Sequence, residues 1–278
     1  MKAKPAKLQS VVSVTFSFIL TVLILILLFA MGLYFGAFNE KIIKHKISES
    51  NYYNETYSLI YENAKTIVTD AGLPFTVLDD AVTLERVYIG GKYYVEDVLK
   101  GIQPTYKTEK LEETLRDNIY NYLEAQKVPI TNELKAGTDE LIAKVSQEYR
   151  RGIQFDFIYS ISKLKQGYMN VILIGMPILL VLIAAIVIIQ LQMYKYKHRA
   201  IRYINSSVIS ASAMVGVITL IMLVTRSYNI TAQPKYYMEF LNNYFKWNIQ
   251  IYLCMAGFGV IVSVLLFALT RHLKENIR

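Results

Sequence analysis

Four long apolar runs constrain this chain more than any other feature of its sequence. The first, Val11 to Phe35, contains no charged residue over 25 positions. As a helix rising 1.5 Å per residue it would reach roughly 37 Å, enough to cross the ~30 Å hydrocarbon core of a bilayer. The other runs are 171–193, 208–224 and 249–270. The third is shorter and more polar, and we expect it to span as well because it lies between two clear runs.

The composition agrees with membrane residence. The chain is 54% hydrophobic and its mean hydropathy is +0.30. The first run is too long for the apolar region of a cleaved signal peptide, so we interpret it as an uncleaved signal-anchor. The single cysteine, Cys254, cannot form a disulfide within the chain, which favours a bacterial origin over a secreted disulfide scaffold.

Basic residues indicate the orientation of the spans. The short segments 1–10, 194–207 and 271–278 together carry ten Lys and Arg and one Glu. Residues 36–170 carry 17 basic and 20 acidic residues, and 225–248 carry three and one. Since Lys and Arg near span ends mark the cytoplasmic side, the three short segments are predicted to be cytoplasmic. The net charge of +8 therefore does not indicate a nucleic-acid partner.

These patterns predict an all-α integral membrane protein of the plasma membrane. We expect four transmembrane helices and a mainly helical extracytoplasmic domain between spans 1 and 2. The predicted boundaries are a cytoplasmic N-terminus 1–10, span 11–35, outer domain 36–170, span 171–193, cytoplasmic loop 194–207, span 208–224, outer loop 225–248, span 249–270 and a cytoplasmic C-terminus 271–278.

Apolar residues in the outer domain recur at helical spacing. The stripes predict helices within 39–71, over 110–127 and from Thr138 onward toward span 2. Gly72 and Pro74 end the first and Pro129 ends the second. We expect the first helix to continue span 1 and the last to lead into span 2.

The segment Val82 to Leu99 fits two structures. Its Gly90-Gly91 pair would suit a hairpin turn, and its apolar spacing would suit two short helices separated at Gly90. We favour two helices, with Asp79 or Asp80 capping the first. Farther along, the aromatic-rich stretch Lys235–Trp247 is predicted to be an amphipathic helix lying flat on the outer membrane surface.

The sequence carries no recognisable catalytic machinery. The histidines His45, His198 and His272 have no Cys, Asp or Glu at metal-ligand spacing, and the common nucleotide-binding and hydrolase motifs are missing. We therefore predict a protein that is not an enzyme and has no cofactor and no metal. The apolar runs also lack ionisable residues, which argues against an ion-coupled carrier acting alone.

Small residues in the spans are the candidate interface. Their spacing lets helices approach closely, whether within this chain or with a partner or second copy. These candidates for helix packing or a partner interface are Ser206, Ser210, Ser212, Gly216, Gly259 and Ser263. Gly175 and Pro177, near the start of span 2, are candidate hinge residues.

We expect a receptor, scaffold or accessory subunit whose outer helical domain binds a partner or ligand. Its partners would be the lipid bilayer and another membrane or envelope protein, with a homo-oligomer also open. The alternative is the membrane subunit of an ATP-driven complex, partnered by an ATPase subunit. The order of spans resembles that of mechanotransmission-type ABC membrane subunits, and this resemblance covers topology alone.

Overall fold

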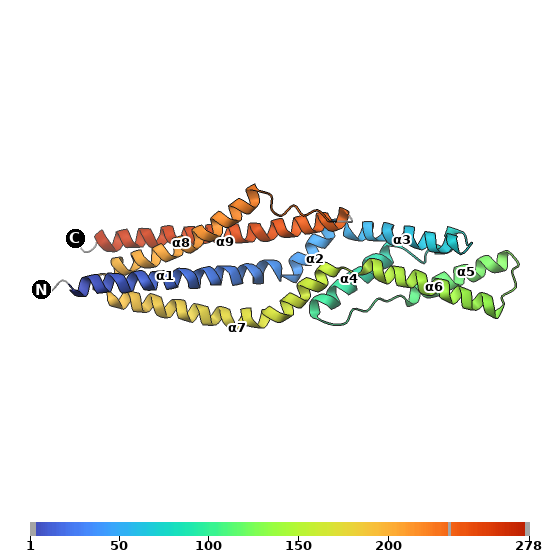
Figure 1. Ribbon diagram of the computed structural model, residues 1–278, viewed down its shortest axis with the longest axis horizontal. Helices are drawn as coiled ribbons and strands as arrows, with labels where there is room; N and C mark the ends of the chain where they lie inside the picture. Colours follow the sequence, from blue (N-terminus) through green and yellow to red (C-terminus); the bar gives the residue numbers. More distant parts are fainter. Residues whose placement is uncertain (1–3, 233–234, 276–278) are drawn as a thin grey trace. The chain divides into compact units, whose positions relative to one another are not determined.

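The computed structural model describes residues 4–232 and 235–275, and every regular element there is a helix (Figure 1). The chain divides into two compact units. The apolar unit comprises residues up to Ile43, Gly167–Ala232 and the chain from Leu241 on. The polar unit comprises Lys44–Gln166 and the segment that ends at Phe240. Of the basic residues used to predict orientation, Lys2 and Arg278 lie outside the described residues.

Four helices are long and apolar enough to cross a membrane, as the sequence predicts. The first is α1 (Lys4–Gly32), which continues through a π-helical turn, η1 (Leu33–Ala37). The others are α7 (Asp156–Met193), α8 (Lys197–Val224) and α9 (Lys235–Glu275). α8 begins at Lys197 rather than 208, because the first turns of this helix already bury apolar side chains, namely Ala200, Ile201 and Ile204.

Hydroxyl groups join α1 to the helices beside it in the apolar unit. α1 and α8 run side by side (Figure 1). The Ser17 and Ser207 hydroxyls lie 2.7 Å apart, and Ser207 also donates to the Ser17 carbonyl. Ser13 and Tyr194 form a second hydroxyl pair at 2.8 Å. Hydrogen bonds of this kind hold apolar helices together where no hydrophobic force distinguishes helix from lipid.

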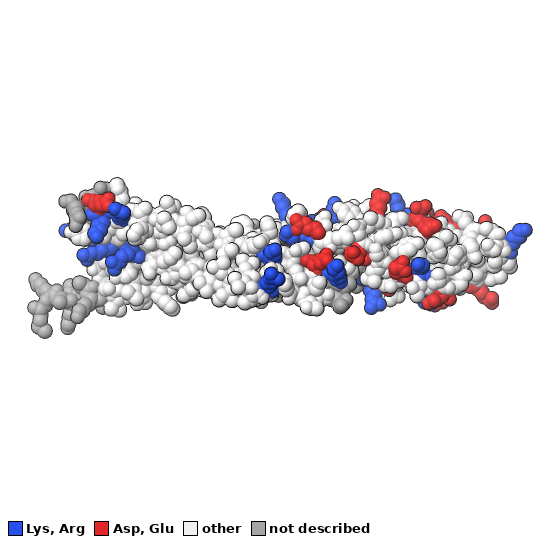
Figure 2. Space-filling view, turned by 90° about the horizontal axis from the view of Figure 1, so that it is seen from above, with Lys and Arg blue, Asp and Glu red and all other residues white. Residues whose placement is uncertain are grey.

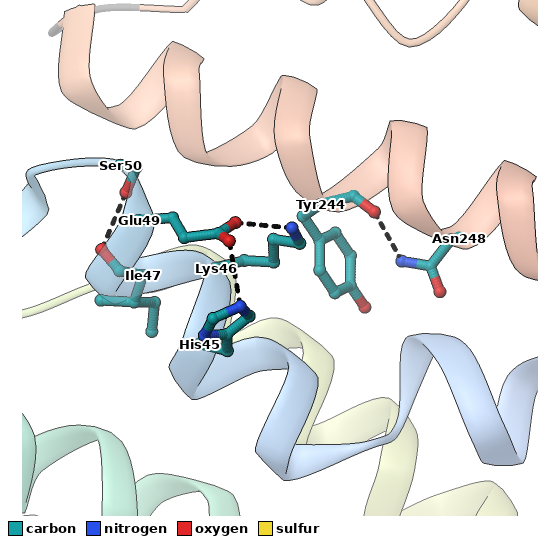
Figure 3. Close-up of polar contacts among 7 residues, drawn as sticks. All are labelled: His45, Lys46, Ile47, Glu49, Ser50, Tyr244 and Asn248. Carbon is teal, nitrogen blue, oxygen red and sulfur yellow. Dashed lines mark hydrogen bonds and ion pairs between the residues drawn. The ribbon is translucent and has the colours of Figure 1, made fainter.

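Glycines let α1 approach α9 closely. A Cβ added at Gly32 would lie 2.0 Å from the Tyr252 ring, and one at Gly36 would lie 2.6 Å from Asn248. The Tyr244 hydroxyl donates to the Ala37 carbonyl at the end of η1, over 2.7 Å. Asn248 in turn donates to the Tyr244 carbonyl (Figure 3). α9 therefore fixes the point where the first apolar helix ends.

The polar unit is a helical bundle with its own core. It contains α3 (Tyr52–Asp70), η2 (Phe75–Leu78), α4 (Leu84–Lys100), α5 (Glu109–Ala125) and α6 (Asn132–Ile153). α3 packs against α4 and α6, and α6 also packs against α5. The core side chains are apolar and fully buried, among them Ile60, Ala64, Val68, Leu78, Val87, Leu111, Leu115 and Val145.

The predicted helix over 39–71 is two helices, because the chain breaks between α2 (Glu40–Glu49) and α3. The Ser50 hydroxyl donates to the Ile47 carbonyl (Figure 3). Asn51 adopts a left-handed conformation with φ 55°. Asn is among the few residues that tolerate this region. The expectation of one helix continuing span 1 is therefore wrong, since breaks occur at Phe38 and at Ser50.

Residues 84–100 form one continuous helix, neither a hairpin nor two short helices. Thr83, rather than Asp79 or Asp80, caps it by accepting a hydrogen bond from the Arg86 amide. The Gly90-Gly91 pair lies inside α4, where both glycines are buried. A Cβ at Gly90 would lie 2.6 Å from the Tyr149 hydroxyl, so this glycine serves close helix packing rather than a turn.

The last helix leads into the second apolar run as predicted, but the helix predicted from Thr138 onward is two helices. α6 ends at Ile153, and α7 begins at Asp156 and runs unbroken to Met193. The chain leaves the helical conformation between them, at Gln154 and Phe155. On the face seen in Figure 2, acidic side chains gather over the polar unit, whereas the apolar helices carry neither sign of charge along most of their length.

Candidate ligand-binding cleft

A cleft of about 530 Å³ lies in the polar unit. Three parts of the chain that are distant in sequence form it. α3 supplies one wall, the end of α6 and the start of α7 supply the second, and the first turn of α9 supplies the third. The lining residues are Tyr52, Leu59, Asn63, Glu148, Arg151, Gly152, Gln154, Asp156, Tyr236 and Tyr237.

Aromatic rings hold these three parts together. The rings of Tyr52 and Phe155 stack with centroids 4.6 Å apart, and Tyr236 meets Tyr52 edge-on at 5.3 Å. Phe155 also contacts Tyr237 at 4.9 Å and Phe240 at 5.0 Å. Offset and edge-on pairs of this kind each add about 0.5–1.5 kcal/mol beyond area burial. The first turn of α9 is thereby fastened to the polar unit.

The tyrosines that line the cleft, Tyr52, Tyr236 and Tyr237, keep their hydroxyl groups protonated. Burial raises the pKa of Tyr52 far above its ordinary value near 10, and it also raises the pKa of Tyr236 and Tyr237. At neutral pH these groups are therefore neutral hydrogen-bond donors and acceptors with flat apolar faces. Such rings suit binding rather than general-base chemistry, because a general base must lose its proton near the working pH.

Charged and polar groups form the rim. Asn63 donates to the Glu148 carboxylate over 2.6 Å and so orients that carboxylate. Gln154 donates to the Tyr106 hydroxyl. Arg151 and Asp156 are exposed, and neither has an ion-pair partner among the residues that the structure describes. The rim therefore presents two carboxylates and one guanidinium to solvent.

Two lining helices leave the cleft and become apolar. Asp156 is the first residue of α7, and Tyr236 and Tyr237 belong to the first turn of α9. Both helices contain long stretches apolar enough to cross a membrane. A molecule bound in the cleft would therefore touch the ends of two candidate spans.

The predicted small-residue interface occupies a different place, between α8 and α9. A Cβ at Gly259 would lie 1.9 Å from the Ser212 hydroxyl, and one at Gly216 would lie 3.5 Å from Ala256. Ser263 donates to the Asn205 side chain over 2.7 Å. Four of the six candidates, Ser212, Gly216, Gly259 and Ser263, thus contact other residues of this chain.

The remaining candidates stand apart from these contacts. Ser206 is exposed and Ser210 is half-buried. Gly175 has open space around it, and Pro177 lies inside α7. Their roles as partner interface and hinge stay predictions.

Sequence reasoning missed the cleft. The sequence predicts that the aromatic residues of 235–247 form a helix lying flat on a membrane surface, whereas they form the start of α9, whose first turn packs on Tyr52 and Phe155. Alternating Tyr and Phe in a segment beside an apolar run suits either environment. Gly32 and Gly36 were also overlooked, although their spacing of four is readable in the sequence.

Within the described ranges, no group of three or more His, Cys, Asp or Glu side chains could hold a metal ion. No protein-family model, curated protein or solved structure matches the chain. Its function therefore has to be argued from the site itself.

Proposed function

We propose that this chain is a multi-pass protein of the plasma membrane whose polar unit lies outside the cell and binds a partner or ligand in the cleft. Both ends would be cytoplasmic. It would act without catalysis, as a receptor, scaffold or accessory subunit of an envelope complex. The observation that carries the proposal is the joint construction of the cleft from α3, α6 and the first turns of α7 and α9.

The orientation is supported by the distribution of charge. The segments predicted to be cytoplasmic hold ten basic residues and one acidic residue, whereas residues 36–170 are net acidic. Lys and Arg are retained on the cytoplasmic side of spans. The polar unit is long enough to fold around its own core, and its core side chains are fully buried.

The cleft suits a ligand or protein segment that presents a cationic group beside a flat or apolar one. Glu148 and Asp156 give the rim an acidic balance against the single Arg151. The faces of Tyr236 and Tyr237 attract cations through the ring quadrupole, by about 0.5–2 kcal/mol depending on desolvation. A concave site with aromatic walls and few convergent polar groups is the usual form of a binding pocket.

Binding at this cleft would bias the positions of two spans at once. Because α7 and α9 are continuous from the cleft into the apolar unit, a ligand that orders their first turns acts directly on both. The turn between α7 and α8 is only Tyr194–Tyr196, which is too short to hold an output domain. We propose that the response passes to another membrane protein.

Site-specific photocrosslinking tests the proposal. A photoreactive amino acid is placed at Leu59, which lines the cleft, or at Ser58, which is exposed on the same turn of α3 and does not line it. In native membranes we expect a discrete adduct at position 59 and none at position 58. Asp156→Asn should reduce the adduct at position 59, and Glu140→Gln, an exposed change elsewhere on the unit, should leave it unchanged.

Identical labelling at positions 58 and 59, or an adduct insensitive to Asp156→Asn, would contradict binding in the cleft. The identity of the captured molecule separates the two functional hypotheses. An envelope protein or small ligand supports the receptor or accessory-subunit function. Consistent co-purification of an ATP-hydrolysing subunit would instead support the membrane subunit of an ATP-driven complex.

A further inference from the structure

A second cavity, of about 370 Å³, lies in the apolar unit between the start of α8 and the end of α9. Its residues repeat at helical spacing on each side. Residues 198, 199 and 202 come from the first two turns of α8, and residues 267, 270, 271 and 274 form one face of α9. The lining side chains are His198, Arg199, Arg202, Phe267, Thr270, Arg271 and Lys274.

The walls of this basic cavity are held in place by the packing beside it. About one turn from the lining residues Arg202 and Phe267, Ser263 of α9 donates to Asn205 of α8 over 2.7 Å. The next turn of α9 brings Gly259 against Ser212. The cationic side chains therefore converge from two helices whose separation is fixed, rather than extending from a flexible loop.

The cavity carries four permanent positive charges and little to balance them. Arg271 pairs with Glu275 over 3.0 Å. Arg199, Arg202 and Lys274 have no ion-pair partner among the described residues, and no carboxylate lines the cavity. The His198 Nδ1 atom is buried and has no hydrogen-bond partner in the described chain. Four like charges around one cavity repel each other, and an anion in the cavity would reduce that repulsion.

The cavity suits a phosphate that is attached to hydrocarbon. Guanidinium groups bind phosphate oxygens through two parallel hydrogen bonds, and Arg from two helices can do so from opposite sides. Phe267, 65% exposed, extends the cavity on its apolar side. A molecule that fills the whole site would carry a phosphate at one end and hydrocarbon at the other.

We propose that the basic cavity binds the phosphate of an anionic membrane lipid, with the start of the acyl chains against Phe267. The proposal rests on the membrane insertion and orientation proposed above, and is independent of ligand binding in the cleft. Basic pockets between helices on the cytoplasmic side are a known way to hold anionic headgroups. Basic residues that only set the orientation of the spans need to lie in the cytoplasmic segment but do not need to line a cavity.

The test compares two double variants that remove equal charge from the same region. Arg199→Gln/Arg202→Gln alters the cavity, whereas Lys195→Gln/Lys197→Gln alters the adjoining residues, which do not line it. Full-length protein is placed in nanodiscs of phosphatidylcholine and phosphatidylglycerol. Native mass spectrometry releases the protein from the nanodisc and counts the lipids that stay bound to it. We expect phosphatidylglycerol retention to fall about tenfold in the cavity variant and less than about twofold in the control.

A third variant guards against misfolding. Arg271→Gln/Lys274→Gln changes the other wall of the cavity and should cause the same loss, while size-exclusion profiles and helicity stay like the parent. Equal losses in the cavity and control variants would overturn the proposal in favour of unlocalised surface charge. Preferential binding of inorganic phosphate, with phosphatidylglycerol displaced by it, would overturn the lipid assignment.

Discussion

Single glycines decide how closely the apolar helices approach. Gly259 is buried against Ser212, with the Ser212 Cβ only 3.0 Å from where a Gly259 side chain would begin. Gly257, two positions earlier on the same helix, is exposed and has nothing within 4 Å of its own Cβ position. Gly257 and Gly259 therefore form a matched pair, because both are glycines of α9 but only Gly259 has close neighbours.

We expect Gly259→Val to destabilise the protein by about 1–3 kcal/mol, because the added methyl groups overpack the contact between α8 and α9. The Ser212 hydroxyl can rotate away, but its Cβ cannot move without shifting α8. Gly257→Val should be near neutral because its side chain meets open space. The measurement is loss of helicity on titrating the detergent-solubilised protein with sodium dodecyl sulfate, followed by circular dichroism. Equal effects of the two variants would rule out the close contact.

At this scale, spacing marks small residues in the sequence but does not show which residues they contact. Ser212, Gly216, Gly259 and Ser263 were found from their spacing, since small residues four apart share a helix face. Spacing does not say which face opposes which, so the pairing of Gly259 with Ser212 required the structure. The residues lining the cleft were missed for a related reason, because they come from three separate parts of the chain.

At the scale of elements, α4 depends on contacts with its neighbours. Tyr149 of α6 reaches across the Gly90 position and donates to the Arg86 carbonyl over 2.7 Å. Its ring is 2% exposed. This burial raises the pKa of Tyr149 to about 12. The neutral hydroxyl is thus part of the contact between α4 and α6.

The raised pKa predicts a loss of stability in alkali. In the unfolded chain Tyr149 loses its proton near pH 10, its ordinary value, whereas in the folded chain it holds the proton until about pH 12. The stabilisation is therefore complete below pH 10 and declines as the pH rises from 10 toward 12. Tyr53 and Tyr94, whose pKa values burial also raises, add to the same decline.

The variant Tyr149→Phe isolates the contribution of Tyr149 to this alkaline loss of stability from that of the other tyrosines. The variant should be less stable than the parent at pH 8 by about 1 kcal/mol, from loss of the hydrogen bond to Arg86. Between pH 10 and 12 it should lose less further stability than the parent does. Thermal unfolding followed by circular dichroism across that range measures both effects. A parent and variant that decline in parallel would show that Tyr149 does not hold its proton in the folded state.

Helix ends were predictable where a residue type dictates the backbone. Gly72 with φ 79° and the Pro129 region end helices as expected. α4 was not predictable in the same way, because Gly90-Gly91 is a strong local signal for a turn. Tertiary packing overrode it, since the missing Cβ atoms admit Tyr149 and Tyr53 against the helix. The break at Ser50–Asn51 likewise lies inside an apolar stripe that continues across it.

For the whole molecule, sequence alone gives the four apolar helices and the intervening polar unit. Both follow from composition over long windows, where the free energy of transferring about 20 apolar residues outweighs local detail. The cleft did not follow, because the sequence treats Lys235–Phe240 as a neighbour of the last span. In the structure this segment belongs to the polar unit. Its tie to Tyr52 and Phe155 makes α9, like α7, common to both units.

The proposed topology predicts which residues a membrane-impermeant thiol reagent can reach in intact cells. In a background with Cys254→Ala, which removes the native thiol, Glu140→Cys in the polar unit and Ser227→Cys after α8 should both be labelled. Lys195→Cys, between α7 and α8, should be labelled only after the membrane is permeabilised. All three parent side chains are exposed, so differences in labelling report the side of the membrane rather than burial.

Labelling of Lys195→Cys and Ser227→Cys on the same side would mean that α8 does not cross. If Lys195→Cys were labelled in intact cells, the basic cavity beside it would not lie at the cytoplasmic surface, and the proposed lipid site would fall with the topology.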